Sequence, residues 1–342
     1  MKKRNQIKKF MSLILLVAMI TAIFVGCSSD QGVQETSEND DTSSANGSEW
    51  PTKPIQLIVP FNAGGDTDFH ARTYAKYLEP ILGQPVVVMN VAGANGSAGT
   101  IQVRDSKADG YTALFFHDSM LMNKVVGVTD FAHEALDVAA AGIMDNSYIL
   151  AVNASSPYHT LDDLIEAAKE NPGQLKYASS IGGYTYYVGA LLEEIAGVSF
   201  NKVDAGGGSD RNAALLANQI DTNVNPYGVM KPYIDSGDFR VLALFSANRS
   251  GLFPDVPTAI EQGYNLVARR AYFLSFPKGI DPSIIEKMSN AMEEVSQMSE
   301  YADDVSTAYG LEPDFLNTEE VNEYLDNAME EFMADQELIL GN

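Results

Sequence analysis

The chain has 342 residues, of which 45% are apolar, so it can bury the cores of two ordinary domains and is not disordered throughout. Its 46 acidic and 22 basic residues give a formal net charge of −24, which disfavours nucleic-acid binding because phosphate backbones repel an acidic surface. The single cysteine, Cys27, excludes an internal disulfide and any cysteine-rich zinc or iron–sulfur site.

Residues 1–26 have the layout of a secretory signal peptide. Five basic residues within positions 2–9 precede an apolar run from Met11 to Val25. The run is shorter than the roughly 20 apolar residues that a membrane span needs. The segment 24–27 (FVGC) is similar to a bacterial lipobox, in which the chain is cleaved before the cysteine and the cysteine is lipidated. Lipidation of Cys27 is therefore predicted; the alternative is an ordinary signal peptide with a chance cysteine.

The segment that follows Cys27 has a different composition. Residues 28–49 contain no basic residue and almost no apolar ones, so they cannot bury enough surface to fold. They are predicted to form a flexible acidic tether. A lipid, a tether and a globular body together predict a protein anchored at the extracytoplasmic face of a bacterial cell membrane.

From residue 50 onward, patterns typical of strands and helices alternate. Short apolar segments predict strands at 54–60, 85–90 and 111–116. A helix is predicted over 66–82, because Ala71, Ala75 and Leu78 fall on one face at helical spacing. This alternation predicts an α/β fold with mainly parallel sheets.

The second half of the chain repeats this alternation. Thr160 and Asp163 have the spacing of a capping box, which predicts a helix that ends at the Asn-Pro-Gly of 171–173. The remaining strands are predicted at 149–152, 175–178, 199–203, 222–225, 240–245 and 272–276. The remaining helices are predicted at 184–196, 210–218, 282–298, 299–309 and 318–337.

Glycine and small polar residues cluster in loops directly after four strands, at 61–68, 93–100, 179–185 and 206–210. In open α/β sheets, ligands bind beyond the carboxyl ends of the strands. Free backbone N–H groups at the start of a helix attract an anion such as a carboxylate. Four loops in matching positions therefore predict a ligand cleft contacted from two sides; the alternative is that the glycines only make tight turns.

Two acids, Asp66 and Asp68, lie in the first of these loops. An acid in the first turn of a helix usually caps it by accepting hydrogen bonds from backbone N–H groups. Two carboxylates beside a bound carboxylate would also repel it. We therefore predict that Asp66 caps the helix; the alternative is that it meets an amine or an ordered water.

No enzyme motif emerges from the sequence. The histidines lack the spacing of a zinc hydrolase, and neither a G-x-S-x-G elbow nor a phosphate-binding P-loop is present. Gly93, Gly96 and Gly99 do not form a G-x-G-x-x-G motif. His117, at the end of the third strand, is retained as a candidate binding residue. The sequence predicts no catalysis, no cofactor and no metal.

A series of short motifs runs through the globular part in order. They are 53–55 (KPI), 59–61 (VPF), 63–65 (AGG), 67–68 (TD), 82–88 (LGQPVVV), 93–96 (GANG), 108–112 (ADGYT), 171–173 (NPG), 177–179 (YAS), 219–221 (QID) and 253–258 (FPDVPT). Over about residues 50–315, this series resembles the Bug-type receptors, which are the extracytoplasmic substrate-binding proteins of tripartite tricarboxylate transporters.

The resemblance implies a two-domain periplasmic-binding-protein fold of a type II-like form, with the ligand cleft between the domains. One domain would combine 50–151 with 274–342, and the other would be 152–273. Such a receptor closes on a small carboxylate, which is a di- or tricarboxylate or an amino-acid-like ligand. It then delivers the ligand to one large and one small integral membrane subunit. A monomer is expected.

The resemblance also implies a set of binding residues, centred on a first glycine loop whose backbone holds a ligand carboxylate. Together with His117, the predicted site residues are Phe61, Asn62, Gly65, Asp66, Thr67, Asp68, Asn95, Gly96, Ser97, Ser179, Ser180, Gly183, Thr185 and Asn225. Asp66 replaces a small residue of the family pattern, 204–206 replaces a Pro-Tyr-Lys run, and Asn225 stands where an acid is frequent. The ligand is therefore expected to carry fewer negative charges than citrate.

Two classes of function remain open at this point. One is a transport receptor, and the other is a ligand-sensing lipoprotein that signals to a membrane partner without transport. Both predict the same cleft, so the sequence does not separate them.

Overall fold

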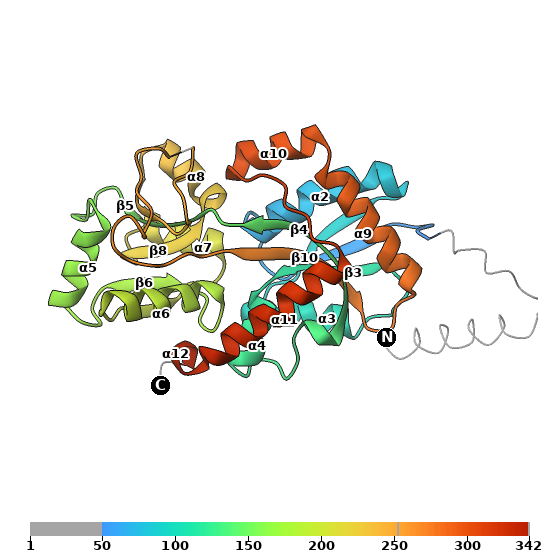
Figure 1. Cartoon of the computed structure of the whole chain (residues 1–342), viewed down its shortest axis with the longest axis horizontal. Coiled ribbons are helices and arrows are strands. Elements are labelled where there is room, and N and C mark those ends of the chain that lie inside the picture. The colour runs from blue at the N-terminus through green and yellow to red at the C-terminus, as the bar shows by residue number, and fades with distance from the viewer. Residues whose placement is uncertain (1–49, 252, 341–342) are drawn as a thin grey trace, which may run out of the picture. The chain divides into compact units, whose positions relative to one another are not determined.

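The computed structural model describes residues 50–251 and 253–340 (Figure 1). The predicted signal peptide, the lipidation site at Cys27 and the acidic tether lie outside the described residues. Within the described residues, the helices are too short or too polar to cross a bilayer.

The first of two five-stranded sheets has the order β2-β1-β3-β10-β4. Its strands are β1 (Ile55–Val59), β2 (Val86–Asn90), β3 (Thr112–His117), β4 (Leu136–Asp145) and β10 (Arg270–Pro277). β1 pairs in parallel with β2 and β3, whereas β10 pairs antiparallel with β3 and β4. Four strands therefore point in one direction, and β10, from much later in the chain, runs against them.

The second sheet repeats this topology, with the order β7-β6-β8-β5-β9. Its strands are β5 (Tyr148–Asn153), β6 (Lys176–Ser179), β7 (Asn201–Asp204), β8 (Thr222–Pro226) and β9 (Phe239–Leu244). Here β5 is the reversed strand between β8 and β9. The two mixed sheets confirm the predicted α/β class.

Helices cover both faces of the first sheet. The helices on this sheet are α2 (Asp66–Leu82), α3 (Ser97–Arg104), α4 (Ser119–Val125), α9 (Pro282–Ser296), α10 (Ser299–Tyr309) and α11 (Thr318–Ala334). Leu57 and Val59 pack in the core beneath α2, α9 and α10, while Ile58 points to the opposite core beneath α3, α4 and α11. This alternation follows from the two-residue period of a strand. We call the first sheet with these helices the first lobe.

The second sheet is covered in the same way. Its helices are α5 (Leu161–Glu170), α6 (Tyr184–Ala196), α7 (Gly208–Leu216) and α8 (Tyr227–Asp235). Leu150 packs in a core with α5 and α6, whereas Ile149 packs in a separate core with α7 and α8. We call the second sheet with these helices the second lobe.

Three segments link the lobes. The chain passes from β4 to β5 through residues 146–147 and returns from β9 to β10 through 245–269. The C-terminal helix α12 (Gln336–Leu340) lies beside α6, so α11 and α12 also reach from the first lobe to the second (Figure 1). There the ring centroids of Phe332 and Tyr187 are 5.3 Å apart.

Several predicted elements match the structure closely. The helices at 66–82, 184–196 and 299–309 have the predicted bounds, and the capping box of Thr160 and Asp163 is present. The predicted helix at 318–337 is divided, because α11 ends at Ala334 and α12 begins at Gln336. Strand β4 and the helices α3, α4 and α8 were not predicted.

Candidate ligand-binding site

A small cavity of about 20 Å³ lies between the lobes, next to the ends of β1, β3 and β6. Its lining residues are Phe61, Asn62, Gly65, Asp66, Asn95, His117, Ser119, Ser180, Tyr184, Thr185, Gly207, Gly208, Ser209, Arg211 and Arg270. This volume holds about one water molecule, so the cavity itself has no room for a larger ligand in this conformation. A wider hollow of about 430 Å³ shares Phe61, Asn62 and Ser180 with the cavity.

Three helices begin at this cavity: α2, α6 and α7. Each follows a glycine N-cap with extended backbone, namely Gly65, Gly183 and Gly207, which has no side chain to accept from the first turn. In α7 the side chain of Asp210 accepts a hydrogen bond from the backbone N–H of Gly207 at 3.2 Å. The first N–H groups of a helix have no acceptor within the helix and carry a partial positive charge. Three helix starts facing one cavity therefore favour an anionic group there.

The lobes approach one another closely at Gly183. A Cβ atom at this position would lie 2.6 Å from the Asn95 side-chain oxygen, which belongs to the first lobe. Asn95 donates hydrogen bonds from Nδ2 to Asn123 at 2.8 Å and to the carbonyl of Gly182 at 3.4 Å. The backbone N–H of Tyr184 also donates to Ser119 Oγ at 3.2 Å. The absence of a side chain at Gly183 thus allows this direct contact between the lobes.

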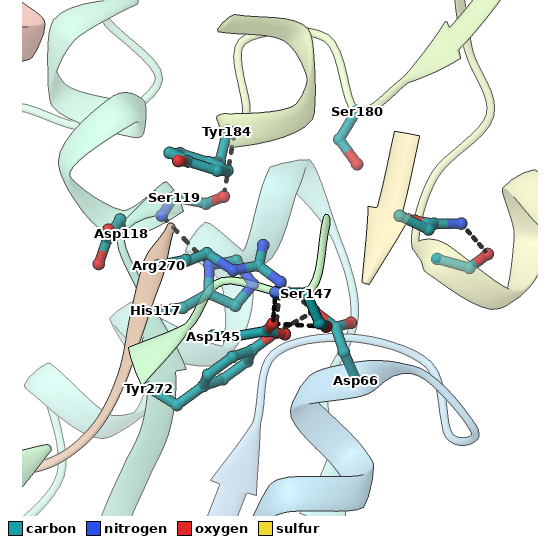
Figure 2. A network of polar contacts seen from close by, with 12 residues as sticks. Asp66, His117, Asp118, Ser119, Asp145, Ser147, Ser180, Tyr184, Arg270 and Tyr272 are labelled. Carbon is teal, nitrogen blue, oxygen red and sulfur yellow. Dashed lines mark hydrogen bonds and ion pairs between the residues drawn. The ribbon is translucent and has the colours of Figure 1, made fainter. Parts of the chain in front are cut away.

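Arg270 is the first residue of β10 and lies almost fully buried beside Asp66 (Figure 2). Its Nη2 donates to Asp66 Oδ2 and to the Tyr272 hydroxyl, and that hydroxyl donates to the same carboxylate oxygen. Burial acts to raise the pKa of Asp66, but the nearby positive charges, that of Arg270 foremost, and the hydrogen bond from Tyr272 together outweigh it and hold the pKa well below its usual range. Asp66 is therefore ionised and paired.

This pairing contradicts the prediction that Asp66 caps α2. Its side chain makes no cap hydrogen bond, because the buried guanidinium of Arg270 offers a stronger partner than a backbone N–H group. Asp68 stabilises the loop instead. It accepts a hydrogen bond from the backbone N–H of Gly64 at 3.0 Å and forms a salt bridge with Arg72.

A second buried arginine, Arg211, enters the cavity from α7. Its Nη1 donates to the carbonyl of Gly206 at 2.8 Å and to Ser180 Oγ at 3.3 Å, and its Nη2 donates to Asn225 Oδ1. These acceptors are all neutral. Its Nε, also buried, has no partner among the described residues. Because arginine stays protonated, this side chain brings a positive charge that no directly bonded carboxylate compensates.

His117 is buried at the end of β3, where its ring stacks on Phe61 with centroids 5.4 Å apart. Burial and the nearby charge of Arg270 hold the pKa of His117 well below its ordinary value. The ring is therefore neutral at neutral pH. The backbone N–H of Ser119 donates to its Nδ1 at 3.2 Å, which leaves the proton on Nε2.

Two further buried acids lie near the cavity. Burial raises the pKa of Asp145 to about 6 and the pKa of Asp118 to about 7. Asp145 is the residue opposite Arg270 in the β4–β10 pair, and it accepts hydrogen bonds from Ser147. Asp118 accepts hydrogen bonds from the Tyr324 hydroxyl at 2.7 Å and from the backbone N–H of Ala271 at 3.3 Å. Asp118 thus links α11 to β10 through these two hydrogen bonds, beside the site.

Comparison with known proteins identifies the family. The sequence model of the tripartite tricarboxylate transporter family receptor matches residues 70–336. The chain belongs to this family. The receptor is 34% identical over 255 residues to Protein BugT of Bordetella pertussis, which spans 72% of this chain and 78% of BugT.

Solved structures share the fold of the receptor. The periplasmic binding protein BugD superposes with a TM-score of 0.77 at 23% identity, covering 84% of this chain and 98% of BugD. R. palustris Rpa4515 with adipate superposes with a TM-score of 0.80 at 23% identity, covering 85% of this chain and 98% of that chain. These likenesses confirm the periplasmic-binding-protein fold.

The structure places the predicted site residues in three groups. Those that line the receptor's cavity are Phe61, Asn62, Gly65, Asp66, Asn95, His117, Ser180 and Thr185. Gly96 lines the wider hollow. Those that line neither space are Thr67, Asp68, Ser97, Ser179, Gly183 and Asn225. Asn225 bonds Arg211, so it acts on the cavity indirectly. Ligand binding by these residues remains a prediction.

Sequence reasoning did not find the two arginines of the receptor site. Both carried a local signal. Arg211 is the fourth residue of α7, near a helix N-terminus, where the helix dipole disfavours a positive charge. Arg270 opens a strand that is otherwise almost entirely apolar and buried. A charged residue placed where its surroundings disfavour a charge indicates a functional role for that residue.

Proposed function

We propose that this receptor binds a small carboxylate between its two lobes. The observation that carries the proposal is the cavity on which three helix N-termini with glycine N-caps converge, together with the buried guanidinium of Arg211. Backbone N–H groups at helix starts and a guanidinium are complementary to a carboxylate. The adipate bound to the related Rpa4515 also supports a carboxylate ligand.

The receptor would work outside the cytoplasm and deliver its ligand to the large and small membrane subunits of a transporter. Membership in a transporter receptor family supports delivery rather than signalling. The signal-peptide pattern and the cysteine that follows it support an extracytoplasmic location with a lipid anchor at Cys27.

The receptor would bind its ligand without changing it. His117 is neutral and stacked on Phe61, and its Nδ1 already accepts a backbone hydrogen bond. Within residues 50–251 and 253–340, no group of His, Cys, Asp or Glu is arranged to hold a metal ion. The ligand recovered after incubation with the receptor should therefore be chemically identical to the ligand supplied.

The direct test is isothermal titration calorimetry with mono-, di- and tricarboxylates of two to six carbons. At least one should bind with one site per chain and raise the melting temperature, because a ligand at 100 times its Kd stabilises the folded state by about 2.7 kcal/mol. Absence of binding by every carboxylate in the series would refute the proposed ligand class.

A further inference from the structure

We infer that the ligand carries a single negative charge, with one carboxylate bound at Arg211 and a neutral group at its other end. This inference rests on the proposed function and narrows it. It follows from the charges that line the cavity and its approach.

The second lobe supplies the positive end of the cavity. Arg211 is 5% exposed, its bonded acceptors are neutral, and its Nε has no partner in the described part of the chain. Gly207, Gly208 and Ser209, at the start of α7, line the cavity beside it. Asp210 in the first turn of α7 and the charge of the nearby Asp66 offset part of this positive potential, so the guanidinium and the helix N-terminus leave a site for one carboxylate and not for two.

The first lobe supplies an end that is already neutralised. Arg270 is bound to the ionised Asp66, and Tyr272 donates to the same carboxylate (Figure 2). Asp66 also lies in the first turn of α2, where it offsets the positive end of that helix. Asp145, opposite Arg270 on β4, adds a second negative charge once the pH is above its pKa of about 6. A second ligand carboxylate would therefore face repulsion here.

The approach to the cavity is also acidic. The wider hollow of about 430 Å³ is lined by Asp204 and Asp210, and its lining includes no basic residue. Asp210 contacts both lobes, since it accepts hydrogen bonds from Asn62 at 3.2 Å and from the backbone of Gly207 at 3.2 Å. A dianion entering through this hollow would be opposed more strongly than a monoanion.

A ligand series that varies charge at nearly constant shape tests this inference. The compounds are succinate, glutarate and adipate, each with its monoamide and its diamide, titrated by calorimetry at pH 8. The monoamide of at least one length should bind about tenfold or more tightly than its diacid and its diamide. Tighter binding of the diacid would overturn the single-charge inference and leave the proposed function intact. Tightest binding of a diamide, or no binding at any length, would overturn both.

One variant at each end of the cavity tests which part of the ligand binds there. Arg211→Gln should weaken binding of the monoamide about tenfold or more, whereas Arg240→Gln should not. Arg240 is a matched control, because its guanidinium donates to backbone carbonyls of the second lobe away from the cavity. Equal monoamide affinity in the parent and in a folded Arg211→Gln variant would overturn the assignment.

Asp66→Asn should shift the preference toward the diacid by about tenfold, because it leaves the charge of Arg270 without its carboxylate. The control is Asp105→Asn, an exposed acid of the first lobe that is paired with Arg104 outside the cavity. An unchanged ratio of monoamide to diacid affinity in a folded Asp66→Asn variant would contradict the inference. The series with the parent protein stands independently of whether this variant folds.

Discussion

At the scale of single residues, the buried acids near the site respond to pH in opposite ways. Asp66 is kept ionised by Arg270, whereas burial raises the pKa of Asp118 from 3.8 to about 7. A raised carboxyl pKa means that the folded state binds the proton more tightly than the unfolded state. The stability contributed by Asp118 is therefore complete below about pH 4 and is lost as the pH rises through 7.

Replacing Asp118 with asparagine should remove this loss, because an amide of the same shape does not ionise. Relative to the parent, Asp118→Asn should gain melting temperature progressively from pH 4 to pH 8 by differential scanning calorimetry. The exposed Asp303→Asn serves as the control. A difference between Asp118→Asn and the parent that is constant over this range would contradict the prediction.

Asn225 offers a second test, because its Oδ1 accepts a hydrogen bond from Arg211. Asn225→Asp keeps the shape but places a carboxylate against that guanidinium, where it would compete with a bound anion. Carboxylate affinity should fall by about tenfold or more in calorimetry. The new charge is paired with Arg211, but the hydrogen bonds donated to Gly208 and Asn212 are lost, so the melting temperature is measured alongside to show that the variant is folded. Unchanged affinity would indicate that Arg211 does not bind the ligand carboxylate.

At the scale of elements, the start of α6 depends on a residue without a side chain. Gly183→Ala would bring a Cβ within 2.6 Å of Asn95 and force that side chain away from Gly182. Loss of such a hydrogen bond costs about 0.5–1.5 kcal/mol, so ligand affinity should fall by roughly two- to tenfold. Gly251→Ala is the matched control, because a Cβ there meets nothing within 4 Å and the residue lies outside the cavity. Equal affinities in these two variants would argue against contact between α6 and Asn95 in the bound state.

Some helices and strands could be predicted from the sequence, and others could not. The helix over 66–82 has a clear apolar face, and the capping box at Thr160 marks a helix start, so both were predictable. Strand β4 was not, because its sequence LDVAAAGIMD is rich in alanine and glycine, which have low strand propensity. Tertiary packing requires glycine at position 142, because a Cβ atom there would lie 2.2 Å from the ring of Tyr74.

The binding site shows the same division. The glycine loops indicated where the cavity lies, because loops after strands meet at the sheet edges. The partner of Asp66 was not predictable, since Arg270 is 204 positions away along the chain. Local patterns report helix starts and strand faces, whereas a buried ion pair depends on the complete fold.

At the scale of the whole molecule, we propose that the first lobe, with β10, moves against the second lobe, with β5, when the ligand enters. A cavity of about 20 Å³ is too small for a dicarboxylate or its amide, so we expect the free protein to adopt a more open state that admits the ligand and then closes on it. Small-angle scattering should give a larger radius of gyration without ligand than at saturation. Identical radii in the two states would contradict a closing motion.

The anchor is also a property of the whole molecule. Cys27→Ser should leave the protein unprocessed or release it from the membrane, because serine offers no thiol for lipidation. Fractionation of cells carrying the parent or the variant measures this directly. A Cys27→Ser protein that is processed and still bound to the membrane would contradict lipidation at this residue.

The central claim is that a carboxylate is held between the lobes by Arg211 and by the helix N-termini. Its most direct test is a crystal structure of the protein with the tightest-binding carboxylate of the series. We expect the ligand carboxylate to accept hydrogen bonds from Arg211 and from backbone N–H groups at the start of α7. A ligand bound outside this cavity, or one whose only carboxylate lies against Asp66 and Arg270, would contradict it.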